Sequence, residues 1–114
     1  MNKKSEIVAT VELDENNVPQ HLHWSSAADN QGGDCKTLFM SMWDTKEKNT
    51  MHLHLWTNDM MVEEMYQFIH QSLAGYIDTI KKATGDEKLA GFMSDFCHDF
   101  ALKAGILKKV DPPQ

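Results

Sequence analysis

The stretch LFMSMWDTKEKNTMHLHLW, residues 38–56, is the most informative about the fold, because apolar residues alternate with other side chains on both sides of a polar segment. Such alternation is typical of β-strands, and a polar segment between two such runs indicates a hairpin. If Asp44 lies opposite Asn49, both apolar rows fall on one face. Residues 35–43 also contain enough helix formers to leave a helix as an alternative there. The predicted cross-strand pairs are Met42–Met51, Met40–Leu53 and Leu38–Leu55.

A second hairpin is predicted upstream. Apolar residues alternate from Ile7 to Leu13, residues 14–17 (DENN) have turn chemistry, and the alternation resumes at Val18. Placing Leu13 opposite Val18 puts both apolar rows on one face and directs Trp24 into the core. The polar, glycine-containing stretch 25–34 predicts a loop between the two hairpins.

The second half of the chain predicts two helices. Apolar residues at helical spacing run from Met61 to Ile80 and again from Leu89 to Ala104. The expected end signals are caps at Asn58 or Asp59 and at Thr84 or Asp86, a left-handed glycine at Gly85, and a helix stop at Gly105.

The sequence therefore predicts a single α+β domain over residues 4–107. Two β-hairpins form a four-stranded antiparallel sheet, and two C-terminal α-helices pack on one of its faces. Residues 108–114 contain two consecutive prolines and predict a flexible C-terminal tail. Methionines at strand or helix spacing, among them Met40, Met42, Met51 and Met61, are predicted to fill the core.

Composition excludes several classes of partner. The formal net charge is −6, and all 11 basic residues are lysine. Proteins that recognise nucleic acid or phosphate rely on the arginine guanidinium, so nucleic acid and anionic lipid are not expected partners. No apolar stretch is long enough for a membrane helix, so direct membrane insertion is not expected either. Two cysteines, Cys35 and Cys97, predict free thiols in a reducing compartment and hence a cytoplasmic protein.

The sheet face turned away from the predicted helices is unusually aromatic. A solvated face normally carries lysine, glutamate and threonine, whereas this one holds large rings and no lysine. A contiguous aromatic patch is more often an interface than bare surface. The alternative, in which the 25–34 loop or the N-terminus covers the patch, stays open. The predicted partner-binding residues are Phe39, Trp43, His52, His54 and Trp56.

Four of the six histidines form two i, i+2 pairs, His21 with His23 and His52 with His54. Together they offer four nitrogens to zinc only if their strands are adjacent in the sheet. No CxxC or HExxH motif supports a metal, and a pH switch needs charged partners that the sequence does not reveal. We therefore expect no cofactor, and keep a metal- or small-ligand-binding protein as the alternative.

No pattern indicates catalysis. Cys97 and His98 are adjacent on a predicted helix and face different ways, so they do not form a thiolate–imidazole pair. The serines lack the glycine-flanked turn of a nucleophile elbow. The prediction is a protein that is not an enzyme.

Several ordered motifs point to a family. The segments VELDENNVPQHLHWS (11–25), LWTNDMMVEEM (55–65) and DFCHDF (95–100) resemble the GldC family of small proteins associated with bacterial gliding motility, and the resemblance spans about residues 4–108. It implies an accessory, non-enzymatic role near the motility and secretion machinery, with no catalytic residues to carry over. We therefore expect an interaction module that uses its aromatic sheet face to dimerise or to hold a partner, with a homo-oligomer as the expected state.

Overall fold

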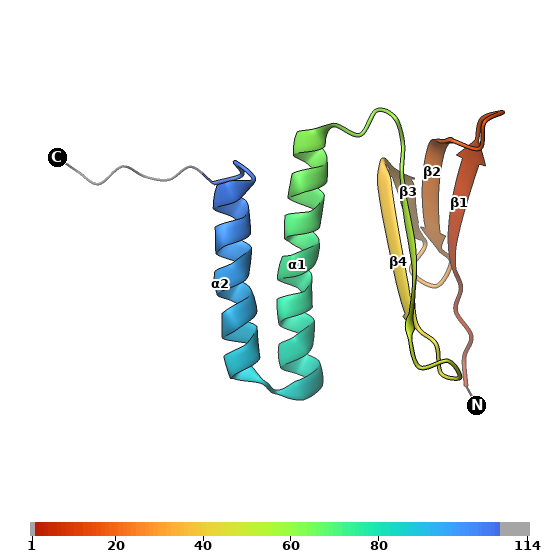
Figure 1. Ribbon diagram of the computed structural model, residues 1–114. Helices are drawn as coiled ribbons and strands as arrows, with labels where there is room; N and C mark the ends of the chain where they lie inside the picture. The colour runs from red at the N-terminus through yellow and green to blue at the C-terminus, as the bar shows by residue number, and fades with distance from the viewer. Residues whose placement is uncertain (1, 108–114) are drawn as a thin grey trace. The chain divides into compact units, whose positions relative to one another are not determined.

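The computed structural model describes residues 2–107, in which the strands precede the helices as predicted (Figure 1). The α+β class and the antiparallel pairing are confirmed. The described residues form two compact units that divide between Met60 and Met61. The elements are β1 (Ile7–Leu13), β2 (Pro19–Ser26), β3 (Gln31–Cys35), β4 (Thr37–Trp43), β5 (Thr50–Trp56), α1 (Val62–Thr84) and α2 (Glu87–Lys103).

The β4–β5 hairpin has the predicted register. Asp44 lies at the start of the turn, and its backbone N–H donates to the Asn49 carbonyl at 2.9 Å. Residues 37–43 are a strand, so the helical alternative is wrong. The three predicted pairs are all present: Met42 with Met51, Met40 with Leu53 and Leu38 with Leu55.

The first hairpin is present, but its predicted register is wrong by two residues. Val11 lies opposite Leu22, and a bulge after Glu12 then places Leu13 opposite Pro19. The reason is the Asp14 carboxylate, which accepts the backbone N–H groups of Asn16 at 2.8 Å and Val18 at 3.0 Å and closes a turn of its own. Because the shift is even, the residues predicted to share a face still do so.

The predicted loop at residues 25–34 is mostly strand. β2 continues to Ser26, the chain turns at residues 27–30, and β3 pairs back along β2. A Cβ atom at Gly32 would lie 2.7 Å from the Trp24 carbonyl oxygen. Glycine is therefore required by the close approach of two strands, and it does not mark a loop.

The strands form two sheets, one of three strands in the order β1-β2-β3 and one of two, β4-β5. The prediction of a single four-stranded sheet is corrected accordingly. The chain passes from one sheet to the other at Lys36, since Cys35 still pairs with Leu22 on β2 whereas Thr37 pairs with Trp56 on β5. At this bend the Thr57 backbone N–H donates to the Lys36 carbonyl at 2.9 Å.

The two helices are antiparallel neighbours (Figure 1), and most of their end signals are as predicted. Gly85, at φ 72°, ends α1, and the Asp86 carboxylate accepts the Leu89 N–H at 2.9 Å at the start of α2. The cap predicted at Asn58 or Asp59 is wrong. Helix α1 begins after Met61, whose N–H donates to Glu64 Oε1 at 3.0 Å. Gly105, at φ 79°, follows the end of α2 as predicted.

The buried apolar core of the described residues is small and consists of Leu22, Ala90, Cys97 and Ala101. Four of the methionines predicted to fill it are exposed, Met42 by 51% and Met51 by 55%, with Met40 and Met61 also exposed, whereas Met65 and Met93 are half-buried. Both faces of the β4–β5 hairpin are therefore accessible within the strand unit. The packing of the helices on a sheet face stays a prediction, and the tail predicted at residues 108–114 lies outside the described residues.

Candidate functional site

The predicted partner-binding residues share one face of the β4–β5 hairpin, here called the aromatic face and made of Phe39, Trp43, His52, His54 and Trp56. The register brings Phe39 opposite His54, and their rings stack with centroids 4.0 Å apart. The His52 ring lies 5.3 Å from that of His54, so three rings adjoin at the centre. Trp43 and Trp56 lie at opposite ends, 67% and 53% exposed. At about 3.3 Å per strand residue, the face is about 20 Å long.

No charged carboxylate or ammonium interrupts this face along β4 and β5. Strand alternation adds only hydroxyl side chains, namely Thr37, Ser41 and Thr50. Ser41 Oγ lies 3.1 Å from His52 Nδ1, which orients that imidazole. The face therefore carries no carboxylate and no lysine, although the chain as a whole is acidic. Such a surface suits an apolar or aromatic partner better than a charged one.

An apolar pocket of about 230 Å³ adjoins the Trp56 end of the aromatic face. It forms where the start of β2 meets the end of β5, so two segments far apart in the sequence build it. The sequence contains no local signal for this meeting. The pocket is lined by Val18, Pro19, His54, Leu55, Trp56 and Asn58.

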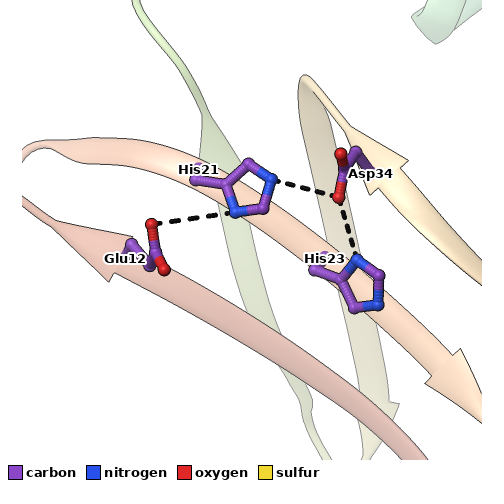
Figure 2. Close-up of polar contacts among 4 residues, drawn as sticks. All are labelled: Glu12, His21, His23 and Asp34. Carbon is purple, nitrogen blue, oxygen red and sulfur yellow. Dashed lines mark hydrogen bonds and ion pairs between the residues drawn. The ribbon is translucent and has the colours of Figure 1, made fainter.

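The other histidine pair forms a hydrogen-bonded cluster on the three-stranded sheet (Figure 2). His21 Nε2 lies 3.0 Å and His23 Nδ1 2.9 Å from the same oxygen, Asp34 Oδ1. Glu12 Oε2 lies 3.8 Å from His21 Nδ1 on the other side. The register explains the cluster, because β2 lies between β1 and β3 with Glu12 opposite His21 and Asp34 opposite His23.

The hydrogen bond from His23 is the main reason why the pKa of Asp34 lies below its usual value, and the charges of His21 and His23 act in the same direction. Asp34 was not among the predicted site residues, because the polar, glycine-containing pattern of residues 25–34 is typical of a loop. The run GGDC, residues 32–35, gives no strand signal of its own, because two of its four residues are glycines, which are typical of loops.

A polar pocket of about 390 Å³ lies at the bend between the two sheets. Burial, and secondarily the Asp34 charge, raises the pKa of the Cys35 thiol, which therefore stays protonated near neutral pH and is a poor nucleophile. A hydrogen bond from Thr57 is the main cause that lowers the pKa of Asp59. The pocket is lined by Gln20, His21, Asp34, Cys35, Lys36, Thr57 and Asp59.

The structure separates the four histidines that the metal alternative needs to bring together. His21 and His23 lie on β2, whose neighbours are β1 and β3, whereas His52 and His54 lie on β5, whose neighbour is β4. Across residues 2–107, no group of three or more His, Cys, Asp or Glu side chains is arranged to hold a metal ion. In the same part of the chain, neither helix combines the length and apolar character needed to span a bilayer.

Fold and surface together define a small α+β protein that presents an aromatic face without carboxylate or lysine side chains on a β-hairpin. Residues 19–106 match the family model described as gliding motility-associated protein GldC-like, and the chain therefore belongs to the GldC-like family. The resemblance seen in its motifs is confirmed, and the family associates the chain with gliding motility. No curated protein and no solved structure matches the chain.

Proposed function

We propose that the chain is a non-enzymatic, cytoplasmic accessory protein of the gliding machinery that binds a protein partner through its aromatic face. The family supports the association with gliding. One observation supports the aromatic face as the binding surface. Trp43 and Trp56 are exposed at its two ends, and the stacked Phe39–His54 pair lies at its centre.

The energetics of the hairpin favour this use. An isolated two-stranded hairpin is marginal in water, and this one is accessible on both faces within its unit. Burying each large aromatic ring contributes about 1.5–3 kcal/mol before ordering costs. Tryptophan is also among the residues that most often dominate binding energy at protein interfaces. A partner on this face therefore stabilises a surface that is costly to leave in water.

The apolar pocket beside Trp56 indicates the chemistry of the partner. Its walls include the Pro19 ring, the Trp56 indole and the His54 imidazole. A partner that inserts one apolar or aromatic side chain there and lays an uncharged strip along the aromatic face is complementary to both features. We also propose a homo-oligomer, in keeping with the small core of the described residues.

The test compares the native chain with a Trp43→Ala, Trp56→Ala double variant. Both are used as bait in the native cell, the captured gliding-machinery protein is identified, and its purified form is then titrated calorimetrically. The double variant is expected to bind at least tenfold more weakly, since each loss of 1.4 kcal/mol is tenfold. Tyr76→Ala is the matched control, because it removes an exposed aromatic ring from α1 and is expected to leave binding unchanged. Equal affinity of the native and double-variant chains for the identified partner would refute the proposal.

A further inference from the structure

The outer edge of β1 is open. Within residues 2–107, β1 pairs with β2 on one side and with no strand on the other (Figure 1). Its sequence, IVATVEL, has no proline, glycine or lysine and a single charged residue, Glu12. Natural proteins usually protect an exposed edge with lysine, proline or a short strand. The other edge of this sheet, β3, follows that rule, because it has five residues that include two glycines and Asp34.

The side chains of β1 are also accessible on both faces. Ile7 is 80% and Leu13 52% exposed, and Val8 on the opposite face is exposed as well. An edge of this kind is a template for another strand, whose backbone completes the hydrogen bonds and whose side chains cover the apolar row.

From these features we infer that β1 binds the β1 strand of a second copy of this chain, antiparallel about a two-fold axis at Thr10. In this register all seven residues pair, with Thr10 facing its own copy, Ala9 facing Val11, and Ile7 facing Leu13. Residues of equal parity lie opposite each other, so the apolar rows of the two copies continue on one face. The product is a continuous six-stranded sheet with β3 of each copy at its outer edges.

The charges of β1 and its flanks are compatible with this self-pairing. Glu12 faces Val8 of the other copy, so the only charge within the strand does not meet itself. Lys3 and Lys4, with Glu6, precede the strand, and Asp14 and Glu15 follow it. Antiparallel pairing therefore places the net basic flank of each copy beside the acidic flank of the other. The contact is isologous and closed, which suits a dimer.

The inference rests on the homo-oligomer part of the proposed function and not on the aromatic face. The experiment uses sedimentation of the native chain, of T10K and of T10E. The native chain is expected to be a dimer, and each variant, with like charges across the axis, is expected to dissociate about fivefold more readily. A 1:1 mixture of the T10K and T10E chains is expected to dimerise again, since opposite charges then meet. Gln31→Lys, an exposed change on the β3 edge, is the control that leaves the dimer unchanged.

A monomeric native chain, two charged variants that dimerise as the native chain does, or a mixture that fails to restore the dimer would each overturn the inference. Should a variant fail to fold, amide exchange of the native chain decides the question. The β1 amides are expected to become protected as concentration rises, and protection independent of concentration contradicts the dimer. The two proposals fail separately, because the Trp43→Ala, Trp56→Ala chain is expected to keep the dimer and T10K to keep the partner.

Discussion

The Phe39 ring on β4 stacks on the His54 imidazole on β5, with centroids 4.0 Å apart and planes 24° from parallel. Direct cross-strand pairing brings the two rings together, and they form the centre of the aromatic face between Trp43 and Trp56. The pair therefore contributes both to the stability of the hairpin and to the shape of the proposed interface.

A double-mutant cycle measures the contribution of this stack. Phe39→Leu, His54→Thr and the double variant are unfolded in urea. The coupling free energy is expected to be about 0.5–1.5 kcal/mol, the range for aromatic pairs beyond their area burial. Ser41→Ala, which removes the hydroxyl that lies beside His52 Nδ1, serves as the comparison variant. A coupling free energy of zero would show that the stack does not stabilise the hairpin.

Gly32→Ala is expected to destabilise the strand unit by about 1–3 kcal/mol, as steric overpacking does. The added Cβ would lie 2.7 Å from the Trp24 carbonyl oxygen, a backbone atom that cannot move without disturbing β2. Gly33→Ala is the matched control, because its nearest atom is Trp24 Nε1 at 3.9 Å, an ordinary contact. Urea denaturation of both variants tests the difference. Similar stabilities would mean that β2 and β3 do not approach so closely.

Asp34→Asn tests the histidine cluster through pH. Because the folded-state pKa of Asp34 is depressed, its carboxylate stabilises the fold above the unfolded value near 3.8 and loses that effect as pH falls through the folded pKa. The native chain is therefore expected to be more stable than Asp34→Asn at pH 5, and the difference is expected to shrink as the pH falls below 3.8 and through the folded-state pKa. Denaturation curves over this range measure it. In a His23→Ala background the difference is expected to shrink, and an unchanged difference would assign the effect to another neighbour.

Two glycines of the helical unit are expected to respond with opposite signs. Gly85→Ala places a Cβ in the left-handed region at φ 72° and is expected to cost about 1–2 kcal/mol. Gly91→Ala lies inside α2 with no other atom near the new Cβ, and is expected to stabilise by about 0.5–1 kcal/mol. Thermal unfolding of both variants distinguishes the two effects. A stabilising Gly85→Ala would contradict the left-handed end of α1.

Register was predictable where a turn alone determines it. The Asp44–Asn49 turn has even length and polar residues, so the pairs of the β4–β5 hairpin and the composition of the aromatic face followed from local pattern. The predicted register of the first hairpin was wrong by two residues, because the Asp14 side chain shapes its turn and a bulge follows Glu12. Neither feature changes the alternation of apolar residues, so the alternation cannot reveal the shift in register.

The order of strands and helices, the glycine that ends α1, the residues of the aromatic face and the family could all be predicted from the sequence. All of these depend on patterns within a few residues or on ordered motifs. Three features could not be predicted in this way: the strand β3, the change of pairing strand at Lys36, and the approach of Asp34 to His21 and His23. Each of them depends on contacts between separate segments, which local patterns do not encode. In the sequence, Gly32 indicates a loop, and its role becomes clear only from its close approach to the Trp24 carbonyl oxygen. Likewise, Pro19 and Trp56 line one pocket only because β2 and β5 come together in the fold.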